Sequence, residues 1–482
     1  MLAYFLAVDY NEPIKSLIEK DESGMKKNLL VAFLLLALVL TGCGSQEAPE
    51  PTEAPTVAPT EAPTAPPPVD VGGTMIERDA TALDLASMTY DMDTLLAAAP
   101  QLEQITQIDL GVTELTFAQV ESIKAAFPNA QVTYGLELLG QTADETTEYL
   151  DFSAMELDQT QELLARLPLL TGLQQINFVS EDGVCVFDLD SISALDEFRA
   201  TLPEVNFKVS FELFGQTVTS EDERIEYYCV SIGNEGVESV RKVLPYLTSC
   251  TYLLMDGCDV DNEVMAQLRD DFPQTKVVWR VWLVKPQYNS ERLLRCGSFL
   301  TDTHRIRTIL VTDRTCDVLK YCTETKYVDF GHNLEISDFS FLGYMPKLEA
   351  AIIGLTNCND ISMLVNCPEL EYLEVYGSKV TDISPLAACT KLKHLNISRM
   401  DIDDITSIYG LELERLRCVD TDVPKAQLEE YASLHPDCQM LLKGYAPHQN
   451  GWRYDDDGNK VPRYALLQEQ MEYAIDAQYG IK

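Results

Sequence analysis

A spacing of 22 residues, repeated in the C-terminal half of the chain, restricts the fold more than any other feature of the sequence. Four segments of one pattern, an aspartate followed by an apolar residue and, in each case, Ser or Thr, begin 22 positions apart at Asp338, Asp360, Asp382 and Asp404. Between them, a leucine is followed by further strand-type residues three and five positions later, starting at Leu348, Leu370, Leu392 and Leu413. A short alternating run, a turn and a second apolar cluster predict one coil of a repeat. Such coils must stack, because none can bury its apolar edge alone.

The pattern resembles the internalin-type leucine-rich repeat of 22 residues over residues 325–425. The resemblance implies a solenoid with a parallel strand in every coil and a partner that is a protein or a glycan. One departure concerns the position where that family has a ladder of asparagines, which here holds Thr356, Ser378, Met400 and Thr421. We therefore expect the backbone of these turns to be satisfied by other groups.

A looser repeat precedes the 22-residue coils. Amphipathic stretches with apolar residues three and four apart end at an apolar residue and a proline, and the prolines are Pro128, Pro168, Pro203, Pro245 and Pro273. Strand-like runs follow at 132–139, 206–214 and 276–284, and residues 127–142 share six of sixteen positions with 202–217. We predict an α/β fold: a leucine-rich repeat solenoid with degenerate helix-containing repeats N-terminal to regular 22-residue coils. Separate α/β domains duplicated in tandem are the alternative.

The N-terminus has the pattern of an export signal. Lys26 and Lys27 precede an apolar run, 29–40, that spans about 18 Å as a helix, too short for a bilayer core of about 30 Å. The ending at 40–43 resembles the lipobox of bacterial lipoproteins, which implies cleavage before Cys43 and a diacylglycerol on its thiol. An ordinary signal peptide with a chance cysteine is the alternative. We expect the mature chain to be lipid-anchored on the extracellular face of the cell membrane.

Segment boundaries follow from composition. We predict a mis-assigned start over 1–24, a signal peptide over 25–42, a lipidated cysteine with a stalk over 43–69, degenerate repeats over 70–300, a leucine-rich repeat region with its cap over 301–443, and a tail over 444–482. The stalk is rich in Pro, Thr and Glu and favours an extended chain, although a proline-rich ligand has the same composition. The cap is a helix ending at Pro436. The tail carries Trp452 and a helical run, 464–473, which we expect to cover the end of the solenoid.

Charge and motifs exclude several functions. The formal net charge of −41 is the wrong sign for a nucleic-acid partner. None of the common local catalytic motifs occurs, and the five histidines form no paired metal-ligand spacing. We therefore expect no enzyme, no cofactor and no metal. Two rival functions remain: a ligand-capturing lipoprotein of a transporter, and an envelope enzyme with a site in residues 80–300.

Twelve cysteines remain if Cys43 is lipidated. Cys367 and Cys389 lie 22 apart and so occupy equivalent places on adjacent coils, at a separation that is compatible with a disulfide. The preferred interpretation is that cysteine is a small apolar filler there.

The candidate binding site is the outward side of the strands. If Leu373 and Val375 point into the core, the alternation of a strand turns their neighbours outward onto an exposed concave face. These candidate residues are Tyr372, Glu374, Tyr376, His394, Asn396, Ser398, Arg415 and Arg417. Tyrosine and arginine are enriched at binding hot spots, so we expect this face to bind a protein or glycan.

Overall fold

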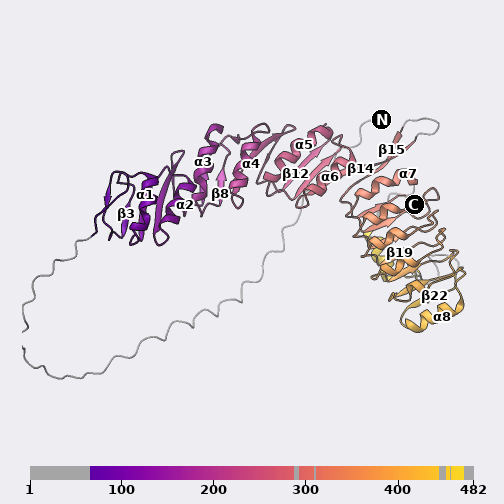
Figure 1. The fold of residues 1–482 in the computed structure, drawn as a ribbon. Coiled ribbons are helices and arrows are strands. Elements are labelled where there is room, and N and C mark those ends of the chain that lie inside the picture. The colour runs from indigo at the N-terminus through magenta and orange to yellow at the C-terminus, as the bar shows by residue number, and fades with distance from the viewer. Residues whose placement is uncertain (1–65, 287–292, 309–310, 445–451, 456, 472–482) are drawn as a thin grey trace, which may run out of the picture. The chain divides into compact units, whose positions relative to one another are not determined.

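The computed structural model describes residues 66–286, 293–308, 311–444, 452–455 and 457–471. The predicted signal peptide, Cys43 and nearly all of the stalk lie outside the described residues. Over the described ranges, no helix is long and apolar enough to cross a membrane. The strands form several small sheets upstream and one seven-stranded sheet downstream (Figure 1).

The downstream sheet contains one strand per coil. Its strands are β16 (Arg305–Arg307), β17 (Tyr327–Asp329), β18 (Ala350–Ile352), β19 (Tyr372–Glu374), β20 (His394–Asn396), β21 (Arg415–Arg417) and β22 (Gln439–Leu441). All neighbours are parallel and follow chain order, and Leu373 lies beside Leu395, which lies beside Leu416. The repeated leucines are fully buried on the inner side. This region is therefore a leucine-rich repeat solenoid, as the spacing predicts, and it extends one coil beyond the predicted repeats at each end.

The repeated aspartate begins the return segment of each coil. Four 3-10 helices follow it: η6 (Ser340–Tyr344), η7 (Ser362–Asn366), η8 (Ser384–Ala388) and η9 (Thr406–Ile408). In each coil the aspartate Oδ1 accepts a hydrogen bond from the backbone N–H two residues later, at 2.7 Å for Asp360 and 2.8 Å for Asp338, Asp382 and Asp404. The side chain thereby satisfies an N–H that the start of a helix leaves without an intrahelical partner.

Hydroxyl groups take the place of the missing asparagines in the turns at Thr356 and Ser378, whereas Met400 has none to offer. The Thr356 hydroxyl donates to the Ile353 carbonyl at 2.8 Å and accepts from the Cys358 N–H at 3.3 Å. Ser378 accepts from the N–H of Val380 at 3.5 Å. The turns are therefore closed by local side-chain bonds that differ from coil to coil.

The cysteines in the described ranges all have free thiols. Cys367 and Cys389 are buried, and each thiol donates to a carbonyl of the preceding coil, Leu342 or Leu364, at 3.4 Å. The interpretation of these cysteines as small buried fillers agrees with this packing, and no disulfide joins them.

The upstream part consists of three units in which parallel strands alternate with helices (Figure 1). The first contains β3 (Ala82–Asp84), α1 (Met92–Ala98), β4 (Gln107–Val112), α2 (Phe117–Ala126), β5 (Gln131–Leu138) and β6 (Gln141–Ala143). The second contains β7 (Tyr149–Asp151), α3 (Thr160–Arg166), β8 (Gln175–Asn177), α4 (Ile192–Thr201) and β9 (Asn206–Lys208), followed by the hairpin β10 (Ser210–Leu213) and β11 (Gln216–Thr219). The third contains β12 (Arg224–Tyr228), α5 (Gly233–Val243), β13 (Tyr252–Asp256), α6 (Asn262–Asp271), β14 (Lys276–Pro286) and β15 (Leu293–Leu300). The helix-containing repeats are thus confirmed.

Antiparallel hairpins separate these units. The turns Leu139-Gly140 and Phe214-Gly215 have positive φ at both residues, the geometry of a type I′ turn, and pair β5 with β6 and β10 with β11. The parallel ladder stops at each hairpin, so the parallel strands form three separate ladders, β3–β5, β7–β9 and β12–β14, and not one continuous sheet. In this respect the upstream part has the arrangement of α/β units in tandem, which sequence analysis ranked second. All three units nevertheless share one hydrophobic core with the solenoid.

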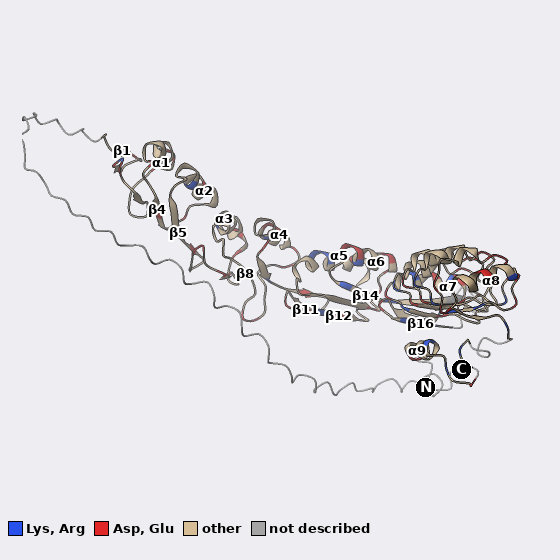
Figure 2. Ribbon diagram, turned by 90° about the horizontal axis from the view of Figure 1, so that it is seen from below, with Lys and Arg blue, Asp and Glu red and all other residues tan. Residues whose placement is uncertain are grey.

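The C-terminal elements differ from expectation in one respect. Helix α8 (Lys425–Leu434) lies at the predicted position, between β21 and β22: the Tyr431 hydroxyl donates to the Leu411 carbonyl at 2.9 Å, and the role of this helix as a cap stays a prediction. Helix α9 (Pro462–Gln470) was expected to cover the end of the solenoid, and that prediction is wrong. It lies against the strand side of the sheet, on the side away from α8 (Figure 2). The rest of the predicted helical run, to Tyr473, lies outside the described residues.

Candidate binding surfaces

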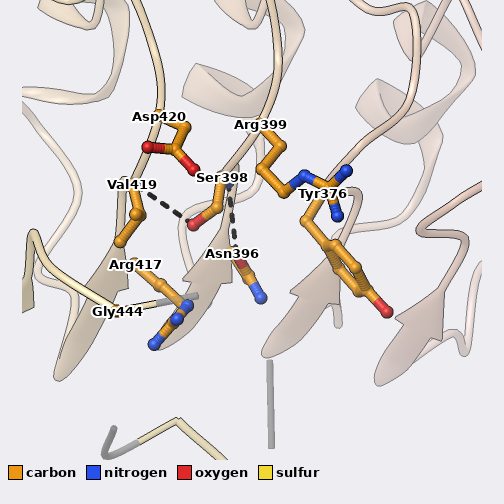
Figure 3. A pocket seen from close by; sticks show the side chains of 8 residues that line it. All are labelled: Tyr376, Asn396, Ser398, Arg399, Arg417, Val419, Asp420 and Gly444. Atoms are coloured by element: carbon orange, nitrogen blue, oxygen red, sulfur yellow. Dashed lines mark hydrogen bonds between the residues drawn. The ribbon is translucent and has the colours of Figure 1, made fainter. Parts of the chain in front are cut away.

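The structure brings the predicted site residues together on one side of the sheet. Tyr372, His394 and Arg415 form one row across β19–β21, and Glu374, Asn396 and Arg417 form the next. Tyr376 and Ser398 each lie two residues beyond the end of their strand and line the same small pocket as Asn396 and Arg417 (Figure 3). The leucine between the two rows points the other way, into the core. The alternation predicted from sequence is therefore correct.

The predicted exposure of this face is wrong. Tyr372, Glu374 and His394 are 1%, 0% and 5% exposed, and the same holds for four of the other five residues: Tyr376, Asn396, Ser398 and Arg417 are buried. Only Arg415 is half-buried. Tyr372, Glu374 and His394 are covered by residues 452–455 and 457–471 of this chain, which we call the C-terminal segment. No periodicity in the coils predicts it, because the segment follows the repeats and has no counterpart within them.

Apolar side chains hold the C-terminal segment on the sheet. Trp452, Val461, Tyr464, Leu467 and Met471 form a cluster with three residues of the sheet, Ala350, Ile352 and Tyr372. The ring centroid of Trp452 lies 5.7 Å from that of Tyr372 and 6.2 Å from that of His394. This cluster is separate from the main core of the solenoid.

A buried ion pair is the second contact. The Arg453 guanidinium donates two hydrogen bonds to the Glu374 carboxylate. The first runs from Nε to Oε1 at 3.0 Å, and the second runs from Nη2 to Oε2. The Tyr372 hydroxyl donates to the same carboxylate, and burial raises the pKa of that phenol well above its ordinary value. Arg453 also lies 5.0 Å from the ring centroid of Tyr464. A carboxylate with no exposed surface requires such partners, since an unpaired buried charge is strongly unfavourable.

His394 is neutral at pH 7 in this environment. Burial lowers its pKa to about 4, and the cations of Arg415 and Arg463 act in the same direction, whereas Glu414, at 3.4 Å from Nε2, opposes the shift. Arg463 itself pairs with Glu371 at 2.8 Å. The imidazole is therefore packed as an aromatic surface, stacked on Tyr372 at 5.8 Å and 25°.

The pocket beside this contact is too small for an organic ligand. It is lined by Tyr376, Asn396, Ser398, Arg399, Arg417, Val419, Asp420 and Gly444, and its volume is about 10 Å³ (Figure 3). That is the space of a single water molecule. Two hydrogen bonds hold the residues that line it in place. The Ser398 N–H donates to Asn396 Oδ1 at 3.2 Å, and the Val419 N–H donates to the Ser398 hydroxyl at 3.1 Å.

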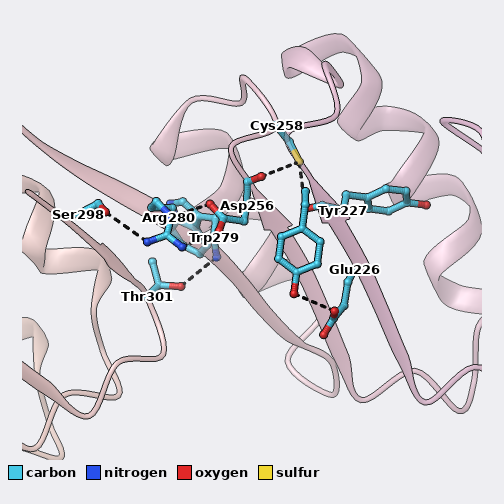
Figure 4. A network of polar contacts seen from close by, with 9 residues as sticks. Glu226, Tyr227, Asp256, Cys258, Trp279, Arg280, Ser298 and Thr301 are labelled. Carbon is cyan, nitrogen blue, oxygen red and sulfur yellow. Dashed lines mark hydrogen bonds and ion pairs between the residues drawn. The ribbon is translucent and has the colours of Figure 1, made fainter. Parts of the chain in front are cut away.

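A second sheet face is open, and sequence analysis missed it. In the third upstream unit the outer side of β12–β15 faces away from α5 and α6 (Figure 2). Arg280 there donates two hydrogen bonds to Asp256, at 2.7 Å and 2.6 Å, and a third to the Ser298 hydroxyl at 3.2 Å (Figure 4). The guanidinium is thereby held in one orientation on a rigid strand.

Aromatic side chains accompany Arg280 on this open face. Trp282 is partly exposed, with the guanidinium of Arg295 4.0 Å from its ring centroid and that of Arg280 at 5.9 Å. Tyr228 is 57% exposed and donates to Glu226 at 2.9 Å. A signal for this face exists in the sequence: from Trp279 to Leu283 the strand β14 alternates, so that Trp279, Val281 and Leu283 are buried while Arg280 and Trp282 face outward.

The described residues offer no metal centre: no group of three or more His, Cys, Asp or Glu side chains among them is placed to hold an ion. The chemistry available on both faces is ion pairing, hydrogen bonding and aromatic contact. Both faces are therefore suited to recognition.

Comparisons with known proteins place the chain among leucine-rich repeat structures only loosely. No family model matches it, and no curated protein does. Among solved structures, it is similar to internalin C2 from Listeria monocytogenes, with 16% identity over 49% of this chain and 81% of that chain and a TM-score of 0.24. A second internalin from that organism shares 18% identity over 73% and 86%, with a TM-score of 0.27. A leucine-rich repeat protein of Leptospira interrogans shares 13% over 74% and 94%, also at 0.27. Such scores carry no weight of their own, and the solenoid is established by its parallel strands.

Proposed function

We propose that this chain is a bacterial lipoprotein, held at the outer face of the cell membrane by Cys43 and its stalk, that binds another protein through its repeat region. The observation that carries the binding role is the open face of β12–β15. A tryptophan between two arginines, on the same sheet face as an exposed tyrosine, is the composition of a binding hot spot. Rigid strands hold these side chains in place before any partner arrives, which reduces the entropy lost on binding.

The anchoring role is supported by the order of segments in the sequence: a charged start, a short apolar run, Cys43, and then a proline-rich stretch. We expect cells that express the full chain to incorporate an alkyne-labelled fatty acid into it, and the Cys43→Ser variant to incorporate none. The unaltered chain should fractionate with membranes. An unlabelled chain found free in the medium would contradict the anchoring.

The binding role is tested with the full chain and the double variant Trp282→Ala, Arg295→Ala. The two chains are incubated with envelope extract and with host-surface extract, and each retained protein is quantified by mass spectrometry. We expect at least one protein to be retained ten-fold or more less by the variant, because hot-spot residues carry most of the binding energy. Lys391→Ala, which removes an exposed ion pair elsewhere in the chain, is the control. Equal retention by all three folded chains would exclude this face.

A further inference from the structure

We propose that the strand side of β18–β21 is a binding site for a polypeptide in which an aromatic residue directly precedes an arginine, and that the C-terminal segment occupies this site in cis. The inference goes beyond the proposed function. It concerns a different sheet, the downstream one, and depends neither on the lipid anchor nor on Trp282.

The arginine subsite is built around Glu374. It is the only carboxylate residue in the described ranges that is fully buried, and it comes from the middle strand of the face. Its two oxygens receive the two parallel donors of Arg453, a geometry that a guanidinium fits and an ammonium does not. The site therefore selects arginine over lysine.

The aromatic subsite lies next to it. Tyr372 and His394, stacked on each other, form the surface against which Trp452 packs. Since Trp452 and Arg453 are adjacent in sequence, the two subsites together bind a dipeptide in which an aromatic residue precedes an arginine. Ala350 and Ile352 extend the apolar surface for the residues that follow.

Two observations support a solenoid that stays folded without the C-terminal segment. The leucines of the coils point away from this face into a core from which the segment is absent. The sheet side of the contact is composed mainly of polar and aromatic groups, which water solvates when the segment leaves. The folded solenoid is thus compatible with both states.

The C-terminal segment also leaves part of the site unused. The Nδ2 group of Asn396 and the Nε1 group of Trp452 are both buried, and neither has a hydrogen-bond partner among the residues that the structure describes. Buried donors of this kind are normally paired. A ligand that offers an acceptor to Asn396 would therefore bind more tightly than the segment does.

The experiment measures binding in trans of a fluorescein-labelled synthetic peptide with the sequence of residues 452–471. The host is the full chain carrying Arg453→Glu, which places a carboxylate against Glu374 and releases the segment. We expect the peptide to bind this host at least ten-fold more tightly than it binds the unaltered chain, whose site is filled. Lys391→Glu, the same charge reversal at an exposed ion pair, is the matched control and should behave as the unaltered chain does.

Specificity is tested in the peptide, so that folding of the host is not in question. Peptides in which the residue equivalent to Arg453 is Lys, or that equivalent to Trp452 is Ala, should each bind the Arg453→Glu host at least ten-fold more weakly. Equal binding of these peptides, or no binding of the parent peptide, would overturn the proposal.

Hydrogen exchange gives the second measurement. In the Arg453→Glu chain, we expect amide exchange to rise within 462–470 while the strands at Leu373 and Leu395 keep their protection. Loss of protection across the whole sheet would show that the C-terminal segment is an integral part of the fold and would also overturn the proposal.

Discussion

The upstream units and the downstream coils both arrange parallel strands in chain order, and they differ in what leads from one strand to the next. Upstream, helices of seven to eleven residues make the crossing, from α1 to α6. Downstream, between β17 and β21, a 3-10 helix of three to five residues makes each crossing. The shorter crossing permits a coil of nearly constant length, and the sheet is unbroken. The longer crossing occurs with hairpins that end each sheet after three parallel strands.

The two regions also differ in the side chains that fill their cores. The second upstream unit is packed with phenylalanines, whereas the coils bury a ladder of leucine, isoleucine, valine and cysteine. Their outer faces differ in whether another part of the chain covers them. The upstream face around Trp282 is open, and the downstream face around Glu374 is covered. Regular repeats therefore determine the inner side of a solenoid, and segments outside the repeats determine whether the outer side is accessible.

The largest expected effect tests the difference between the cores. Phe178 contacts four rings, those of Phe152, Phe187, Phe198 and Phe207, with centroids 4.9 to 6.2 Å away. Phe178→Ala should lower the free energy of unfolding by about 3–5 kcal/mol, because it leaves a cavity among rings that cannot collapse into it. Ile397→Val, in the ladder, should lower it by about 0.5–1.5 kcal/mol. Denaturant unfolding measures both. Similar losses of unfolding free energy in the two variants would contradict the proposed difference between the two cores.

A smaller effect tests the cover on the downstream face. The pKa of His394 is lowered to about 4 in the folded chain, from an ordinary 6.5. Below pH 6.5 the unfolded chain therefore binds more protons than the folded chain does, so stability is complete above 6.5 and falls as the pH drops toward 4. A shift of one pKa unit corresponds to about 1.4 kcal/mol, so the shift from 6.5 to about 4 limits the loss of unfolding free energy to about 3 kcal/mol.

We expect this loss to appear first as loosening of the C-terminal segment, because Trp452 packs on the imidazole that must become charged. Amide exchange within 462–470, corrected for the intrinsic rate, should rise between pH 7 and pH 4.5. His394→Gln should show no such rise. An equal pH response in both chains would mean that another group controls the contact.

Most of the fold is predictable from the sequence, because the physical cause lies within a few residues of its effect. The 22-residue spacing predicts the strands at Leu373, Leu395 and Leu416, and the proline after each amphipathic stretch predicts where the upstream helices end. The sheet breaks are harder to predict, since they depend on Leu139-Gly140 and Phe214-Gly215 adopting positive φ.

The candidate site is predictable only in part. Alternation correctly places Tyr372 and Glu374 on the outer side of β19. Their burial depends on Trp452 and Arg453, some 80 residues later in the chain, and no local pattern reports a contact over that separation. The open face is hard to predict for a different reason: alternation separates the two sides of β14, but it does not tell which side the helices α5 and α6 leave uncovered.

Each strand of the solenoid is hydrogen-bonded only to the strands before and after it, which has a mechanical consequence. Tension applied to the ends of the repeat array is carried by one ladder at a time, so the coils should peel away in sequence. Every coil that opens releases 21 to 24 residues, or on the order of 75 Å of extended chain. An array built in this way yields in nearly equal steps under load, and so acts as an extensible tether.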